Sequence, residues 1–175
     1  MLEFTVYCCR DNPVVIDEVR ERLARFGLPA TVMQDAEEGA TTARWFITLE
    51  EDPTSEEDTM LDAQMVVLDV SSDKALVRGA AMSLLMGFEG ADDGEDIAEI
   101  KARLKKSQQS FFCSVTPTSS GLRILQIATL AACLDAGDGV LHDGTREEYY
   151  PRSTIANFLK AELGDDAEAL LAAIR

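Results

Sequence analysis

One stretch limits the fold of this chain more than any other, because residues 120–136 predict a helix that is apolar on almost every side. The hydroxyls of residues 118–120 can accept hydrogen bonds from the open N–H groups of a first helical turn. Gly137 can adopt the left-handed conformation that ends a helix. A helix of this kind belongs inside a layered domain. Its only polar stripe consists of Arg123, Gln126 and Thr129.

Strand and helix patterns alternate along the rest of the chain. Strands are expected at 3–9, 30–34, 43–49, 65–70, 111–115, 139–142 and 146–150, and further helices at about 13–26, 73–88, 95–107, 153–163 and 165–174. Apolar strands need cover on one or both faces. We therefore predict an α+β (α/β-like) fold, a single domain over 1–175 with a mixed central sheet of about six strands and helices packed on it.

Two local signals refine these helices. Asn12 as a cap and Pro13 at a first helical position predict a helix start, and Gly27 predicts its end. Gly79 lies inside the helix expected at 73–88, where a glycine costs about 1 kcal/mol relative to alanine on an exposed face. We therefore expect Gly79 to pack closely against a neighbour.

Charge is the most unusual property of the composition. The chain has 32 acids against 16 lysines and arginines, a formal net charge of −16. Such a field repels nucleic acid and anionic membranes and attracts basic partners. The acids cluster in 35–62 and 89–96, although solubility alone also favours acidic surfaces. The acids expected to contact a basic protein partner are Glu50, Glu51, Asp52, Glu56, Glu57, Asp58, Asp92 and Asp93.

No pattern in the sequence specifies a catalytic, metal or cofactor site. There is no P-loop, GxGxxG, GxSxG or HExxH motif, so we name no catalytic residue and expect no cofactor. The cysteines have apolar neighbours, no CxxC spacing and one histidine to join them, which favours buried reduced thiols over a metal site. The start Met1-Leu2-Glu3 lacks a secretory pattern, and we expect a cytoplasmic protein. The cysteines are Cys8, Cys9, Cys113 and Cys133.

The most chemical-looking group of residues is Asp138, His142 and Asp143. A histidine beside carboxylates can act as a general base, and a ligand site here is one alternative. The same residues also have a structural explanation, because Asp138-Gly139 and Asp143-Gly144 are typical turn sequences.

The order SFFCSVTP, LRILQIATLAACLDAGD, GVLHDG and Tyr149-Tyr150-Pro151 resembles uncharacterised bacterial α/β domains, some of which occur as immunity proteins of polymorphic toxins. The resemblance covers the C-terminal third of the chain and carries no catalytic residue. It implies a small, acidic, non-enzymatic cytosolic protein that neutralises a basic partner by binding.

Charge and resemblance together favour an immunity or inhibitor protein that covers the basic surface of a toxin or nuclease. An apolar or aromatic anchor would have to supply much of the affinity, and the sequence does not show which one. Two alternatives stay open: a small-ligand-binding or hydrolytic domain that uses Asp138, His142 and Asp143, and a structural subunit of a larger bacterial assembly. The sequence leaves the oligomeric state undetermined.

Overall fold

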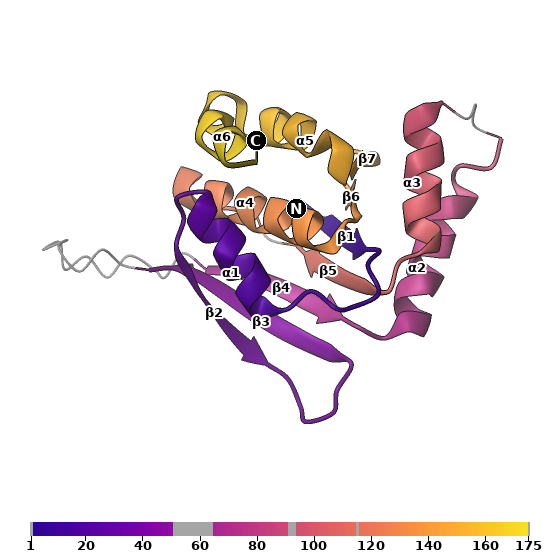
Figure 1. The fold of residues 1–175 in the computed structure, drawn as a ribbon, viewed down its shortest axis with the longest axis horizontal. Coiled ribbons are helices and arrows are strands. Elements are labelled where there is room, and N and C mark those ends of the chain that lie inside the picture. Colours follow the sequence, from indigo (N-terminus) through magenta and orange to yellow (C-terminus); the bar gives the residue numbers. More distant parts are fainter. Residues whose placement is uncertain (1, 51–64, 91–93, 115, 175) are drawn as a thin grey trace, which may run out of the picture.

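A computed structural model describes residues 2–50, 65–90, 94–114 and 116–174 (Figure 1). The strands are β1 (Phe4–Cys8), β2 (Ala30–Asp35), β3 (Thr42–Leu49), β4 (Met65–Ser71), β5 (Gln109–Cys113), β6 (Val140–Asp143) and β7 (Glu148–Pro151). The helices are α1 (Ile16–Arg25), α2 (Lys74–Met86), α3 (Glu95–Lys105), α4 (Ser120–Gly137), α5 (Ile155–Leu163) and α6 (Glu168–Ile174), with short 3-10 helices η1 (Arg152–Thr154) and η2 (Gly164–Ala167).

The described strands form one sheet in the order β2-β3-β4-β5-β1-β6-β7. A single α+β domain with helices packed on a sheet is confirmed. The predicted mixed sheet of about six strands needs correction, because the structure has seven described strands and every neighbouring pair is antiparallel.

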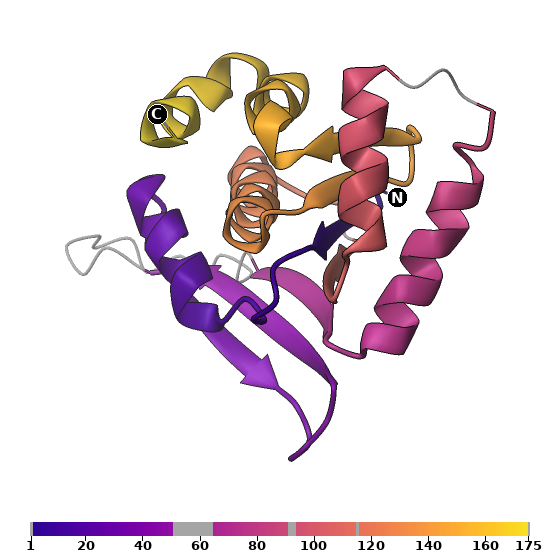
Figure 2. The ribbon, with the colours of Figure 1, turned by 45° about the vertical axis from the view of Figure 1, so that its right-hand side comes forward.

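The connections explain why no neighbouring strands are parallel in the described sheet. α2 and α3 pack against each other between β4 and β5, and their two passes return the chain to the end of the sheet that it left (Figure 2). A single helix, α4, connects β5 to β6, which run in the same direction. β1 lies between these two strands and is antiparallel to both. Alternation of strands and helices along the sequence does not reveal such an inserted strand.

The helices cover the two faces of the sheet unequally. α1, α4, α5 and α6 pack over one face and enclose the main core, whereas α2 and α3 cover part of the other face (Figures 1 and 2). α4 lies at the centre of the main core, and it contacts β1, β4, β6, α1 and α5. Most of its residues are buried, as its sequence predicts.

Both ends of α4 follow from its sequence, with one correction. The Ser119 hydroxyl caps the helix by accepting a hydrogen bond from the Leu122 N–H at 3.1 Å. The left-handed residue at the other end is Asp138, with φ of 46°, and not Gly137. Gly137 is needed for another reason, because a Cβ atom there would lie 2.2 Å from the Sγ atom of Cys8. This close approach of helix and strand is a tertiary constraint.

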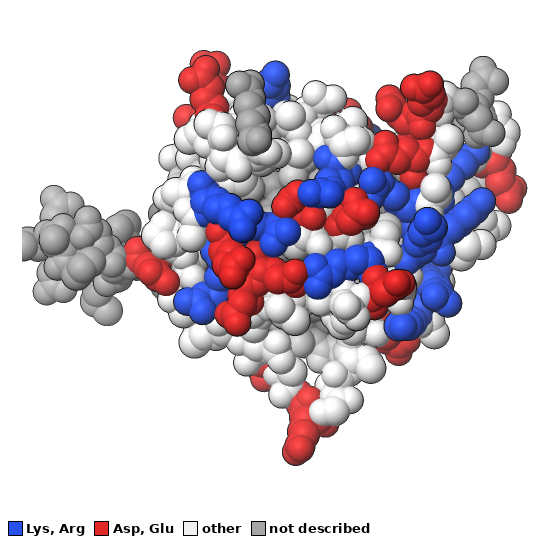
Figure 3. Space-filling model, viewed as in Figure 1, with Lys and Arg blue, Asp and Glu red and all other residues white. Residues whose placement is uncertain are grey.

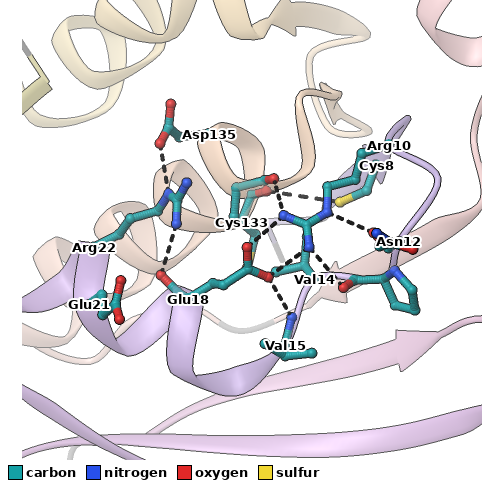
Figure 4. Close-up of polar contacts among 12 residues, drawn as sticks. Cys8, Arg10, Asn12, Val14, Val15, Glu18, Glu21, Arg22, Cys133 and Asp135 are labelled. Carbon is teal, nitrogen blue, oxygen red and sulfur yellow. Dashed lines mark hydrogen bonds and ion pairs between the residues drawn. The ribbon is translucent and has the colours of Figure 1, made fainter.

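The start of α1 also differs from its prediction. The helix begins at Ile16 with Val15 as its N-cap, three residues after Asn12-Pro13. Arg10 explains the delay, since its guanidinium donates to the backbone carbonyls of Asn12 at 2.7 Å and Pro13 at 3.1 Å (Figure 4). These carbonyls are held by a side chain instead of entering the helix. Gly27, with φ of 76°, follows the end of α1 as predicted.

Candidate functional site

In the half of the sheet formed by β2, β3 and β4, one face is not covered by any helix of the described residues. Met33, Phe46 and Val67 are aligned across these three strands, and Met33 is 60% exposed. Phe46 and Val67 are partly exposed and belong to neither buried core of the described chain. We call this surface the open face, and it comprises Thr31, Met33, Asp35, Arg44, Phe46, Thr48, Met65, Val67, Asp69, Ser110 and Phe112.

A polar row runs beside the apolar row. Asp35, Arg44 and Asp69 are aligned across β2, β3 and β4, and Phe112 continues the row on β5. The Nε atom of Arg44 donates to Oδ1 of Asp69 at 2.8 Å. This ion pair is exposed, so screening by solvent leaves it little effect on stability. Its clearer effect is to fix a charged border along the apolar row.

A pocket of about 530 Å³ opens at the β2–β3 turn end of the open face. The carboxylates of Asp35, Glu37 and Asp69 line it together with a single base, Arg44. Phe112 supplies an aromatic wall, partly exposed to solvent. Three acids against one base leave the pocket net negative, and an aromatic face beside it can also attract a cation. The pocket therefore suits a lysine or arginine side chain better than an acidic group.

Most of the acids predicted to contact a partner lie outside the described residues. Glu51, Asp52, Glu56, Glu57 and Asp58 fall in 51–64, and Asp92 and Asp93 fall in 91–93. Glu50 is described: it follows β3 directly and is exposed, and its Oε1 lies 4.0 Å from a guanidinium nitrogen of Arg20.

His142 and Asp143 point away from each other because they are consecutive residues of β6. The His142 ring stacks on Tyr149 at a centroid distance of 4.6 Å, and its Nε2 lies 3.4 Å from Oε2 of Glu147. Asp143 is fully buried, and its Oδ1 accepts from the backbone N–H groups of Thr145 at 2.9 Å and Arg146 at 3.1 Å. Asp143 therefore closes the β6–β7 turn, as its turn sequence indicates.

Asp138, the third member of the predicted ligand site, belongs to a different cluster. Its Oδ1 accepts from Arg103 of α3 at 2.8 Å and lies 3.7 Å from Arg152 of η1. Each of Asp138, His142 and Asp143 thus has its own set of partners. The structure does not bring the three side chains together around one reaction centre.

A band of alternating charges crosses the side of α1, α4 and α3 (Figure 3), and we call it the ionic belt. Asp138 belongs to it through its ion pairs with Arg103 and Arg152. Asp135 is its centre, accepting from Arg22 of α1 at 2.7 Å and from Arg152 at 2.9 Å. Burial alone would raise the pKa of Asp135, but these two hydrogen bonds outweigh it and hold the pKa below its ordinary value. The belt consists of Arg10, Glu18, Arg22, Glu99, Arg103, Asp135, Asp138 and Arg152.

One end of the ionic belt is shown in Figure 4, where Arg10 faces Glu18. The guanidinium donates to both Glu18 carboxylate oxygens, at 2.6 and 2.9 Å, and to the Ala136 carbonyl at 3.1 Å. The Glu18 carboxylate also accepts a hydrogen bond from the Val15 N–H at 3.0 Å, at the start of α1. The hydrogen bond from Arg10 lowers the pKa of Glu18. These hydrogen bonds connect the segment of Arg10, the start of α1 and the end of α4 within the chain.

The described residues hold no group of three or more histidine, cysteine, aspartate and glutamate side chains that could bind a metal ion. The four cysteines are free thiols, and three are buried as expected. Cys9 is only partly buried, and burial raises its pKa to about 11 in spite of the nearby Arg103. A thiol with this pKa stays protonated at neutral pH and is a poor nucleophile.

Sequence reasoning missed the open face, although a signal was present. Phe46 lies between the core residues Trp45 and Ile47, and Val67 lies between Val66 and Leu68. A strand with one solvated face normally alternates apolar and polar residues. Apolar residues on both faces of a strand predict that each face contacts a partner. On the open face of this half of the sheet, that partner is not a helix of the described chain.

Neither the scan against protein-family models nor the searches of curated proteins and solved structures found a match for this chain. Among the described residues, none of the helices combines the length and apolarity needed to cross a membrane.

Proposed function

We propose that this protein is a non-enzymatic binding protein that uses the open face to cover a basic protein, in the manner of an immunity protein that inhibits a toxin or nuclease. The observation that carries the proposal is the apolar row of Met33, Phe46 and Val67, exposed on a strongly acidic molecule. A strongly acidic protein pairs best with a basic partner, because charge complementarity raises the rate at which the two proteins meet.

The chemistry of the open face supports a partner with two features. Its centre would contact the apolar row, because desolvated apolar and aromatic anchors supply most of the affinity at protein interfaces. Its edge would place a lysine or arginine in the pocket lined by Asp35, Glu37 and Asp69. The predicted acids of 51–64 follow β3 in the chain and would add to the same negative field. The likeness of the C-terminal third to immunity proteins agrees with this function and stays a prediction.

The two alternative functions find less support. A ligand or hydrolytic site needs side chains that converge, and Asp138, His142 and Asp143 are engaged in separate interactions. A structural subunit of a larger assembly would also use an exposed face, but it would not require a basic partner. Salt dependence separates this alternative from the proposed inhibitor.

The experiment is a pull-down from the lysate of the host with wild-type protein and two variants, identified by mass spectrometry. Met33→Glu places a charge in the apolar row, and Val15→Glu is a matched control at a residue 53% exposed beside α1. We expect a basic protein to be retained by wild type and Val15→Glu, lost with Met33→Glu, and released by salt. Equal retention by both variants, or a retained partner that is acidic or insensitive to salt, would contradict the proposal.

A further inference from the structure

β2 is one edge of the sheet in the part of the chain that the structure describes (Figure 1). The strand has six residues, and it contains neither proline nor lysine. Natural edge strands are normally short, covered or interrupted by such residues, because their unpaired backbone groups can bind another strand. The opposite edge follows this rule: β7 has four residues, ends at Pro151 and contacts α3 and α5. The edge of β2 lacks these protections.

The register of β2 and β3 determines which backbone groups of β2 point away from the sheet. The Glu50 N–H donates to the Pro29 carbonyl at 2.9 Å, in the same register as the strands themselves. Bonded and non-bonded pairs alternate in an antiparallel ladder, so the odd-numbered residues of β2 bond to β3. The N–H and C=O groups of Val32 and Gln34 therefore point outward, where no described strand lies beside them.

A groove follows this edge between β2 and α1. A pocket of about 440 Å³ lies at the start of β2, and a second pocket of about 500 Å³ reaches Gln34 and Ala36. Asp17 of α1 lines both pockets, so they flank the strand along its length. Arg20 donates to the Ala30 carbonyl at 3.4 Å, and the free part of the edge begins at Val32. The groove has the extended shape that a peptide strand requires.

The charge of this edge determines which segment fits it. Exposed acids outnumber bases on the flank of α1 and at the two ends of β2. The acids are Asp17, Glu21, Asp35, Glu37, Glu38 and Glu50, and the bases are Arg20 and Arg25. Two copies of such an edge would repel each other, which disfavours pairing of β2 with a second copy of the chain. A segment with lysine or arginine at alternate positions would be attracted.

We infer that an extended basic segment of the partner adds to the sheet as an antiparallel strand beside β2. Main-chain hydrogen bonds to Val32 and Gln34 hold the segment. The residues that make these bonds direct their side chains toward α1 and its acids, because Val32 itself packs against the main core on that side. The residues between them extend the apolar row of the open face beyond Met33. This inference rests on the proposed function for the basic partner and adds how the partner is held.

A peptide of about eight residues that alternates lysine and valine, with blocked ends, is the probe. In a titration followed by NMR, the amide signals of Val32 and Gln34 should shift and become protected from hydrogen exchange. Those of Thr31 and Met33, which already bond to β3, should change less. A peptide that alternates glutamate and valine should bind about tenfold more weakly or worse. Equal binding of the two peptides, or no binding of the lysine peptide at about 1 mM, would overturn the inference.

Backbone methylation of the peptide separates strand addition from simple charge attraction. Methyl groups on the backbone nitrogens of the lysines remove the N–H groups that face Val32 and Gln34, and should raise the peptide Kd about tenfold or more. Methyl groups on the backbone nitrogens of the valines leave those hydrogen bonds in place, and should raise it about threefold at most. Equal losses with the two methylated peptides would contradict antiparallel addition.

Two variants at Gln34 test the same edge from the side of the protein. Gln34→Pro and Gln34→Ala both remove the side chain that bonds to Trp45, but only proline also removes the outward N–H. Edge strands tolerate proline where the N–H faces solvent, so the two variants should unfold at similar temperatures. Gln34→Pro should raise the Kd of the lysine peptide about tenfold relative to Gln34→Ala. Equal Kd values would overturn the inference.

The pull-down from lysate distinguishes failure of this inference from failure of the proposed function. Equal retention of a basic protein by Gln34→Pro and Gln34→Ala, with loss for Met33→Glu, would overturn strand addition and leave the open face as the binding surface. Binding of the lysine peptide without retention of any basic protein would overturn the proposed function and leave β2 as a site for basic strands.

Discussion

The two halves of the sheet show how differently similar strands can be used. β1, at the centre of one half, has α4 on one face and α3 on the other, whereas the helices of the described residues cover β3 on one face only. Phe111 and Phe112 illustrate the difference on a single strand, β5. Phe111 is fully buried, with its ring 5.2 Å from that of Trp45, and Phe112 is partly exposed on the open face. The first half is covered on both faces, whereas the second keeps one face that no helix of the described residues covers.

The largest expected effect separates these two phenylalanines. Phe111→Ala removes a buried ring and should lower the free energy of unfolding by about 3–5 kcal/mol. Phe112→Ala should lower it by about 1 kcal/mol, since its ring already meets solvent. Urea unfolding followed by circular dichroism measures both values. Equal losses would show that the open face is part of the core and would break the comparison.

Two helical glycines give the next largest contrast. Gly137→Ala should lower the free energy of unfolding by about 1–3 kcal/mol, because its new methyl group collides with Cys8. Gly79→Ala should raise it by up to about 1 kcal/mol, because alanine is the better helix former and the position is open. Thermal unfolding at micromolar concentration checks the two signs. A loss of stability at Gly79 would mean that the surface of α2 is packed within the monomer.

The smallest expected effect concerns the ionic belt of the covered half. The pKa of Asp135 is lowered in the folded protein, so its stabilising contribution is present above the unfolded pKa of about 4 and is lost as pH falls through the folded value. Asp135→Asn should cost about 1 kcal/mol at pH 7, because the pairs are partly exposed.

The difference between wild type and Asp135→Asn should disappear at low pH, as measured by urea unfolding from about pH 7 to pH 2. Glu38→Gln, at an exposed position in the β2–β3 turn, is a control of equal charge change. A constant difference at all pH values would show that packing, and not the charge of Asp135, explains the loss.

The sequence predicted the parts of this protein that depend on local patterns. The buried helix with its Ser119 cap, the strands β2 and β3, and the end of α1 at Gly27 follow from periodicity and capping chemistry, which act within a few residues. The acidic composition and the absence of known catalytic motifs are likewise properties of the chain itself. The local strand and helix patterns are sufficient to predict an α+β domain.

Tertiary structure alone decided which apolar residues became core and which became surface. Met82 and Phe46 are as apolar as their buried neighbours, but Met82 is 54% exposed and Phe46 is partly exposed. Tertiary structure also decided the insertion of β1 between β5 and β6 and the separate positions of Asp138, His142 and Asp143. Burial depends on contacts between segments far apart in the chain, and a local pattern records only that a residue favours burial.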